Sequence, residues 1–218
     1  IRVGYLAVEF IENVVSFFSI QLLTAYDASE FEVYVYSILP NEDILTDDLR
    51  KHVTVWRSFP VGTMVHQIAS DIAQDEVDIL FDLSVHTNGG MTLPVMAMHP
   101  ALIQIAGIGY MSTSGLQAID YFLTDIYLDP PGQHDGDFSE QLIRLPHSHL
   151  CYTPPERALQ CREMWVLLQP IVFGSFNNFA SITDSRLLVW KEILSRVPGA
   201  KLLLKNASLY NWNQRKMA

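Results

Sequence analysis

The residues best suited to bind a ligand lie in a polar loop between an apolar run and an amphipathic helix. The loop extends from Ser175 to Ser181 and contains Asn177 and Asn178, whose amides both donate and accept hydrogen bonds. Phosphates favour the start of a helix, because its first backbone N–H groups lack partners within the helix. The two asparagines can therefore bind a nucleotide or a sugar, or they can satisfy the backbone of their own loop.

Other polar residues suggest ligand contacts in the same way, and each has a plainer alternative. His86 follows a buried apolar run and either contacts a substrate or is a structural histidine in a polar turn. Thr113, Ser114 and Gly115 form a small-residue loop that either lets a substrate approach closely or is a tight turn. Lys205, at the end of a later strand, either approaches a phosphate or remains solvated.

Metal and nucleophile chemistry find little support in the sequence. His147, His149 and Cys151 alternate, which would place three zinc-type ligands on one face of a strand. A second pair of ligands is missing, so we predict no metal site. The serine, histidine and aspartate residues show no nucleophile elbow, which argues against a hydrolase of that type.

The elements around the polar loop form a predicted βαβ unit. An apolar strand over 171–173 precedes the loop, and the helix Asp184–Arg196 follows it with apolar residues spaced by three and four. Thr183 is the predicted N-cap, and the strand Lys201–Leu204 comes next. Ligands bind at the carboxyl ends of strands in open parallel sheets, which is where this loop would lie.

Upstream, short strands alternate with helices. The predicted strands span 2–7, 31–36, 53–56, 77–83, 101–106, 119–124 and 141–145; the predicted helices span 14–26, 64–74 and 93–98, with a helix or loop over 41–51. This alternation predicts an α/β domain over 1–145 with a doubly wound parallel sheet. Residues 146–170 are the predicted linker, and 171–218 the predicted start of a second domain.

The composition of the chain disfavours some classes of binding partner. The 218 residues are 49% hydrophobic and 17% charged, with a net charge of -10, so we expect neither nucleic acid nor an anionic membrane as a main partner. Two cysteines cannot form a disulfide framework, which predicts a reducing, cytoplasmic location. The chain starts at Ile1 within a predicted strand, and we expect it to be a fragment of a longer protein.

Ordered blocks of sequence resemble the catalytic region of protein O-GlcNAc transferases and SPINDLY-type proteins across almost the whole chain. They are Arg2–Tyr5, Val77–Leu83 with His86-Thr87, His99–Ala101 with Gln104, Gly109-Tyr110 with Thr113–Gly115, Ala118–Tyr121 and Leu123–Asp125, Ser139-Glu140 with Arg144–Pro146, Cys151-Tyr152, Phe173–Asn178, and Val197–Gly199 with Leu202–Lys205.

The resemblance implies an α/β fold of two Rossmann-like domains (GT-B type), the second truncated here, with tetratricopeptide repeats upstream. It implies transfer of a sugar, with GlcNAc from UDP-GlcNAc as the expected donor, to Ser or Thr hydroxyls of proteins. The anomeric centre would be inverted without a metal or other cofactor. UDP-glucose and GDP-fucose are the other donors that relatives use.

Two functional positions of the family are substituted in this chain. By motif, the family's diphosphate-binding lysine falls on Ser181 and its cleft histidine falls on Asn13. Serine carries no positive charge and asparagine is no general base, and losing such a cation would cost about 3 kcal/mol of transition-state stabilisation. The alternative is therefore a degenerate, non-catalytic member that binds protein or nucleotide. Asp75 aligns with a carboxylate suspected as a base in relatives, although helix termination or surface charge is the favoured interpretation.

Overall fold

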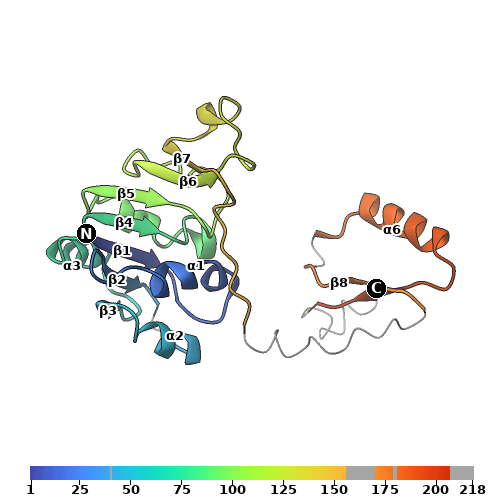
Figure 1. Ribbon diagram of the computed structural model, residues 1–218, viewed down its shortest axis with the longest axis horizontal. Helices are drawn as coiled ribbons and strands as arrows, with labels where there is room; N and C mark the ends of the chain where they lie inside the picture. Colours follow the sequence, from blue (N-terminus) through green and yellow to red (C-terminus); the bar gives the residue numbers. More distant parts are fainter. Residues whose placement is uncertain (40, 156–169, 179–180, 207–218) are drawn as a thin grey trace. The chain divides into compact units, whose positions relative to one another are not determined.

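The computed structural model describes residues 1–39, 41–155, 170–178 and 181–206, which belong to two compact units (Figure 1). The first unit extends from Ile1 to Leu159 and the second from Gln160 to Ala218. The first contains a seven-stranded sheet and the second a two-stranded sheet. Among the helices of the described ranges, none is long and apolar enough to cross a membrane.

The sheet of the first unit is parallel throughout. Its strands are β1 (Arg2–Ala7), β2 (Glu32–Ser37), β3 (Val55–Ser58), β4 (Ile79–Asp82), β5 (Ile103–Ala106), β6 (Tyr121–Asp125) and β7 (Gln141–Leu145). They lie in the order β3-β2-β1-β4-β5-β6-β7, and each neighbouring pair is parallel. The predicted α/β fold with a parallel sheet is confirmed. This order reverses direction between β1 and β4, which creates a topological switch point of the Rossmann type.

Helices cover both faces of this sheet (Figure 1). They are α1 (Val14–Thr24), α2 (Ile44–Leu49), α3 (Val65–Gln74) and α4 (Leu93–Met96), with short 3-10 turns η1 (Thr87–Gly89) and η2 (Asp135–Asp137). Leu23 of α1 and Leu49 of α2 pack in one buried cluster with Phe81. Ile72 of α3 and Met96 of α4 belong to a second cluster, on the opposite face. The burial of both faces explains why β4 is apolar at nearly every position.

The last two crossovers of the first unit lack an α-helix, in agreement with the predicted elements, which include no helix between residue 98 and the end of this sheet. Residues 107–120, between β5 and β6, contain no helix, and the β6–β7 connection has only η2. Gln104 anchors the first of these crossovers, because its buried side-chain Nε2 donates to the carbonyl of Ala118 at 2.6 Å and to that of Met96 at 2.9 Å. Hydrogen bonds from a buried amide thus replace the packing of a helix.

Several element ends were predicted wrongly by one or two residues. Helix α1 ends at Thr24 rather than at 26, and β3 lies at Val55–Ser58 rather than at 53–56. β4 and β5 each begin two residues later than predicted, and β6 runs from Tyr121 to Asp125. Strand ends are set by where pairing with the neighbouring strands stops, and a single strand's composition does not show that.

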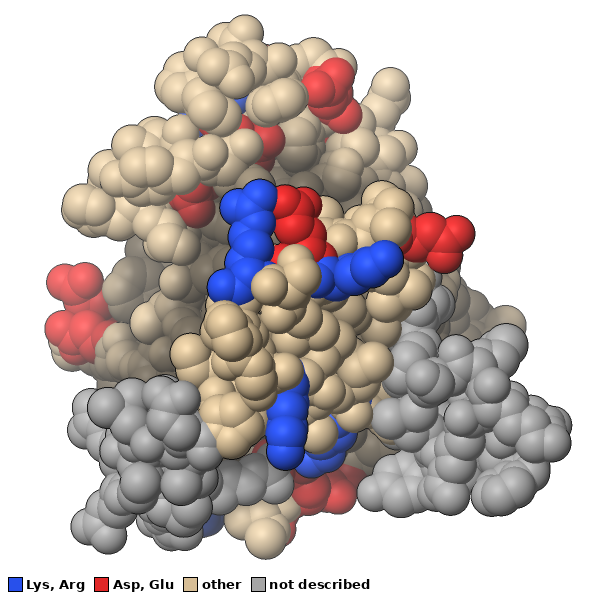
Figure 2. Space-filling model, turned by 90° about the vertical axis from the view of Figure 1, so that its right-hand side faces the viewer, with Lys and Arg blue, Asp and Glu red and all other residues tan. Residues whose placement is uncertain are grey.

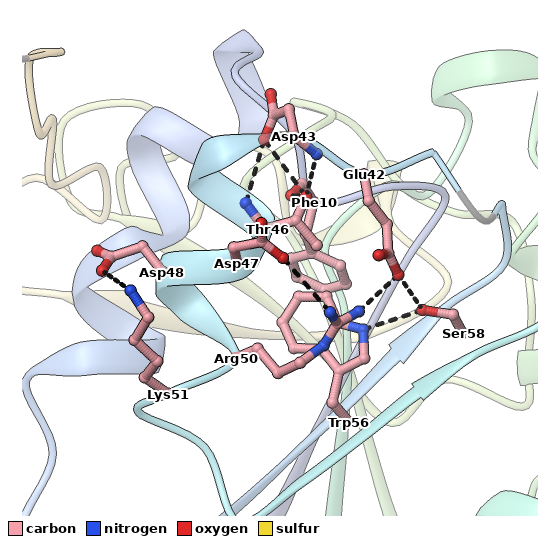
Figure 3. Close-up of polar contacts among 10 residues, drawn as sticks. All are labelled: Phe10, Glu42, Asp43, Thr46, Asp47, Asp48, Arg50, Lys51, Trp56 and Ser58. Carbon is pink, nitrogen blue, oxygen red and sulfur yellow. Dashed lines mark hydrogen bonds and ion pairs between the residues drawn. The ribbon is translucent and has the colours of Figure 1, made fainter.

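The short helix α2 is stabilised by hydrogen bonds at its N-terminus and by contacts of Arg50, the residue after its last turn (Figure 3). Asp43 accepts the Thr46 N–H at 3.1 Å while the Thr46 hydroxyl oxygen accepts the Asp43 N–H at 3.1 Å, forming a capping box. The same hydroxyl donates to the Phe10 carbonyl at 2.7 Å, which ties α2 to the loop after β1. The Arg50 guanidinium lies 5.2 Å from the centre of the Trp56 ring. These contacts explain why a polar stretch predicted only as a helix or loop is helical.

The second unit is the predicted βαβ motif. It consists of β8 (Val172–Ser175), α6 (Asp184–Arg196) and β9 (Lys201–Leu204), and the two strands are parallel. The Thr183 hydroxyl accepts the Arg186 N–H at 3.4 Å, so the predicted N-cap is confirmed. No residue of α6 is buried, and three side chains of its predicted core face, Leu187, Leu188 and Ile193, are exposed.

Candidate functional site at the carboxyl edges of the two sheets

The switch point of the first sheet holds a hollow of about 280 Å³. It is lined by residues that follow β1 and β4, namely Val8, Glu9, Asn13, Val14, Val15, Ser84, Thr87 and Asn88. Asn13 is the N-cap of α1, and its side-chain oxygen accepts the Ser16 N–H at 2.9 Å. The predicted family position therefore lies at a ligand-binding edge, while its amide oxygen is used for capping.

The loops behind this hollow are strained and tightly packed. Val85 and Ile108 are buried β-branched residues with φ of 50° and 70°, a conformation that costs such residues on the order of 1–3 kcal/mol. Asp82 holds the first loop, because one carboxylate oxygen accepts the N–H groups of Ser84 at 2.9 Å and Val85 at 3.0 Å. Complete burial raises the pKa of the Asp82 carboxyl above its usual range.

The loop after β5 packs against the loop after β4 through its backbone. A Cβ atom at Gly109 would lie 2.2 Å from the Leu83 carbonyl oxygen, so only glycine fits at this position. A Cβ at Gly107 would lie 3.1 Å from the Leu123 carbonyl oxygen, and its φ is +156°. The approach at Gly109 fixes this loop against the loop after β4, and the approach at Gly107 fixes it against β6.

His86 and the Thr113–Gly115 loop, predicted separately, are brought together by the structure. His86 is exposed, its Nε2 atom lies 3.1 Å from the Ser114 carbonyl oxygen, and its ring packs edge-on at 4.9 Å from Tyr110. It does not line the hollow that contains Asn13. Ser114 is 4% exposed, and its N–H and hydroxyl both donate to the Glu140 carboxylate, whereas Gly115 is exposed. The polar groups of Ser114 are thus engaged within the protein.

In the second unit, the candidate residues surround the loop after β8. The Ser181 N–H and hydroxyl both donate to the Asn178 carbonyl, at 3.0 and 2.6 Å. The Asn177 carbonyl accepts from the Asn206 side chain at 2.9 Å. The Lys205 N–H donates to the Ser175 carbonyl at 3.0 Å, and the Lys205 side chain is exposed. The structure therefore gathers Asn177, Asn178 and Ser181 in one loop, with Lys205 at the adjacent strand end.

Arg186 is a charged residue of this site that the sequence analysis missed. It lies in the first turn of α6, and its guanidinium donates to the Ser181 carbonyl at 2.6 Å. With Ser175 and Asn177 it lines a hollow of about 540 Å³ whose remaining walls are mostly apolar. The Ser175 hydroxyl oxygen is buried and has no hydrogen-bond partner within the described residues. The spacing Thr183-x-x-Arg186 was visible in the sequence, but the turn of the guanidinium back to Ser181 was not.

Basic side chains are spread over the surface of the second unit. Figure 2 looks onto this unit and shows separate Lys and Arg side chains on a largely uncharged surface, with few acidic ones beside them. Such a surface suits an anionic ligand better than the acidic first unit does.

The remaining candidates have structural roles. His147, His149 and Cys151 lie beyond the end of β7, so the expected strand face is absent. His149 Nδ1 lies 2.7 Å from the Asp125 carboxylate, and both side chains are buried. The hydrogen bond with His149 lowers the pKa of Asp125 below its usual range. Within the described ranges, no three His, Cys, Asp or Glu side chains form a metal-binding group.

Asp75 ends α3, as the favoured interpretation held, but it is not a surface charge. Its side chain is 10% exposed and accepts from Arg57 Nε at 2.7 Å and from the Tyr36 hydroxyl at 2.9 Å. It precedes β4, so it lies at the amino edge of the sheet, opposite the switch-point hollow.

A Rossmann-like parallel sheet with its polar loops gathered at the β1–β4 switch point defines a class of α/β proteins that includes many glycosyltransferases. A family model described as "Glycosyl transferase family 41" matches residues 1–154. The chain therefore belongs to glycosyl transferase family 41.

Similar proteins agree with this assignment. The chain is 39% identical, over 94% of its length, to "Probable UDP-N-acetylglucosamine--peptide N-acetylglucosaminyltransferase SPINDLY" of Arabidopsis thaliana, and 40% identical, over 93%, to the protein of the same name from Oryza sativa subsp. japonica. It spans 23% and 22% of those two proteins. A solved mutant of the Thermobaculum terrenum O-GlcNAc transferase matches 99% of the chain with a TM-score of 0.87 and 32% identity, and the chain covers 40% of it. The resemblance to O-GlcNAc transferases and SPINDLY-type proteins is confirmed.

Proposed function

We propose that the protein containing this chain transfers a sugar, with GlcNAc from UDP-GlcNAc as the expected donor, to Ser or Thr hydroxyls of proteins. The observation that carries the proposal is the match of 99% of the chain to a solved O-GlcNAc transferase at a TM-score of 0.87. The SPINDLY relatives, whose names specify the same donor and a peptide acceptor, support it.

The transfer needs an acceptor for one proton and a counter-charge for the leaving group. As the acceptor oxygen bonds to the anomeric carbon, the bond from that carbon to the diphosphate breaks and the hydroxyl proton must be taken up. His86 is the proposed proton acceptor at the edge of the first sheet. Asn13 cannot take this role, since its side chain is a neutral amide that caps α1.

The leaving diphosphate would be stabilised by the loop after β8 and the start of α6. Arg186 supplies a positive charge 2.6 Å from the carbonyl of Ser181, the residue at the family's lysine position. The unpartnered Ser175 hydroxyl and the amide of Asn177 line the same hollow. N–H groups of the first turn of α6 add a favourable dipole for an anion. Lys205 is proposed as a second, more distant cation.

The proposal retains inversion at the anomeric carbon without metal, a cytoplasmic location, upstream tetratricopeptide repeats, and neither nucleic acid nor membrane as a partner. Thr113, Ser114 and Gly115 are retained as residues near the protein acceptor. Ser114 would act there through its backbone, because its hydroxyl is bound to Glu140.

A second function, a non-catalytic module that binds nucleotide or protein, is favoured by one observation. Asn13 and Ser181 lack the base and the cation of their family positions, and the polar groups of Ser181 are used within its own loop. Calorimetric binding of UDP and GDP to the full-length protein, followed by donor hydrolysis and transfer assays, separates the two functions. UDP-GlcNAc, UDP-glucose and GDP-fucose are compared as donors.

Arg186→Ala should weaken UDP binding about tenfold, because one charge-assisted hydrogen bond is worth about 1.4 kcal/mol or more. Lys191→Ala, which removes an exposed cation from the same helix, should leave binding unchanged. Ser181→Lys should raise the hydrolysis rate. If the protein binds nucleotide but does not hydrolyse the donor, and Ser181→Lys does not restore hydrolysis, the result would contradict the transferase and support the binding module.

A further inference from the structure

The buried carboxylate of Glu140 holds the β5–β6 crossover. Glu140 immediately precedes β7 and is 5% exposed. One of its oxygens accepts both the N–H of Ser114, at 2.8 Å, and the Ser114 hydroxyl; the other accepts the Thr113 hydroxyl at 2.7 Å. Hydrogen bonds to a carboxylate are about twice as strong as those between neutral groups, so they fix the two residues that they join.

The backbone that Glu140 holds is in contact with His86. The peptide group between Ser114 and Gly115 has its carbonyl oxygen 3.1 Å from His86 Nε2 and its N–H 3.0 Å from the Thr113 hydroxyl oxygen. Because both oxygens of Glu140 hold the residues around this peptide group, they determine its orientation. Glu140 thereby acts on His86 across a chain of contacts from the start of β7 to the loop after β4.

This contact determines which nitrogen of His86 carries the proton. A carbonyl oxygen only accepts hydrogen bonds, so Nε2 must be the donor and the neutral ring keeps its lone pair on Nδ1. Nδ1 has no hydrogen bond within the part of the chain that the structure describes, and the residue is exposed. The edge-on contact with Tyr110 supports the ring from another side.

We propose that Glu140 is a positioning residue for His86, which it holds through Ser114 as the Nε2–H tautomer with Nδ1 facing outward as the proton-accepting atom. A purely local role would be to close the crossover turn. The Thr113 hydroxyl already closes it by accepting the N–H groups of Gly115 and Ser139. The role of Nδ1 as a proton acceptor rests on the proposed transferase function. The coupling between Glu140 and His86 does not depend on that function.

The coupling is tested by NMR on the full chain with ¹⁵N-labelled histidine. His86→Gln identifies the His86 signals. In the wild type, we expect a protected Nε2–H proton and an unprotonated Nδ1. Glu140→Gln should speed exchange of the Nε2–H proton with water about tenfold, because the charged acceptor is lost. Ser114→Ala keeps the carbonyl that contacts His86, so it should speed exchange of the Nε2–H proton less than Glu140→Gln does. It serves as the second variant if Glu140→Gln does not fold.

The matched control is Asp129→Asn. Asp129 is a buried carboxylate of the next crossover, and it accepts from the Thr124 hydroxyl at 2.5 Å rather than from the residues that hold His86. This variant should leave His86 exchange unchanged. A folded Glu140→Gln variant with wild-type exchange at His86 would overturn the proposal, and so would an equal effect of Asp129→Asn.

Kinetics of the full-length protein supply the second readout. Glu140→Gln should lower kcat about tenfold with little change in KM for the sugar nucleotide, and His86→Gln should lower it about a hundredfold. In the His86→Gln background, Glu140→Gln should have no further effect. Multiplicative effects of the two changes would show that Glu140 acts elsewhere. If the wild type transfers no sugar, the proposed function fails, while the exchange experiment still decides the coupling.

Discussion

The two units differ in both charge and packing. The first unit, residues 1–159, carries 21 acidic and 6 basic side chains, whereas the second, residues 160–218, carries 3 acidic and 8 basic ones. The first unit buries two apolar clusters, and the second buries no residue of its helix. Under the proposed function, the acidic, closely packed unit orients neutral groups for the acceptor, while the basic unit offers charge to an anionic donor. Rigidity and charge are thus divided between the units.

The largest expected difference is in how each unit tolerates a methyl group. Gly109→Ala would place Cβ 2.2 Å from the Leu83 carbonyl oxygen, and we expect it to lower the free energy of unfolding by about 3 kcal/mol or more. Gly174→Ala in β8 meets only the Phe176 ring at 3.5 Å and should change it by less than about 0.5 kcal/mol. Urea unfolding followed by circular dichroism measures both. Equal effects would contradict the packing difference.

An intermediate effect is expected from Asp75, whose pKa depends on opposing causes. Burial alone would raise the pKa of this carboxyl, but hydrogen bonds from Arg57 and Tyr36 outweigh burial and keep it below its usual 3.8. The bonds therefore stabilise the fold fully above pH 3.8, and this contribution is lost as the pH falls through the lower folded pKa.

Asp75→Asn should cost about 1.5 kcal/mol near neutral pH, since Arg57 is 42% exposed and water screens the pair. The difference in the free energy of unfolding between variant and wild type should become smaller only below pH 3.8. Urea unfolding across a pH series measures it. Glu192→Gln in α6 breaks an exposed pair with Arg196 and serves as the control, with almost no effect expected. A gap that stays constant into acid would show that the charge of Asp75 is irrelevant.

The smallest effects are expected at the two helix starts. Asp43→Ala removes the carboxylate that accepts the N–H groups of Thr46 at 3.1 Å and Glu12 at 2.7 Å, and should lower the free energy of unfolding by about 1 kcal/mol. Thr183→Ala removes a capping bond of 3.4 Å and an exposed contact of 2.9 Å with the Ser185 hydroxyl, and should lower the free energy of unfolding by about 0.5 kcal/mol. Thermal unfolding compares them, with Asp48→Ala, an exposed residue of α2 outside the cap, as control. A larger loss at Thr183 would reverse the expected order.

Local patterns predicted the elements whose limits are set locally. The helix Asp184–Arg196 and the strand Gln141–Leu145 have the predicted bounds, because caps, turns and periodicity are properties of neighbouring residues. The class of fold followed from alternating strands and helices. The absence of a helix between β5 and β6 was predicted, but the anchor of that crossover was not, because Gln104 donates to carbonyls 8 and 14 residues away in the sequence.

The candidate site was predicted less completely, for a physical reason. The sequence indicated His86 and Ser114 as separate residues, but they lie 28 positions apart, and only the folded chain brings them into contact. Glu140 and Arg186 were missed as functional candidates, because each acts through backbone groups that only the folded chain brings near. The same cause explains the pairing of His149 with Asp125, where the sequence had suggested a strand of possible metal ligands.

The place of Glu140 next to β7 also affects how the first unit opens. Among the strands that the structure describes, β7 pairs only with β6 and is an edge strand, and edge strands are among the first segments to separate in local unfolding. Since the residue that precedes β7 also holds Ser114 and Thr113, detachment of this edge would release the β5–β6 crossover with it. The two segments would then form one cooperative unit of opening, and the orientation of a side chain near the middle of the sheet would depend on the stability of its outermost strand.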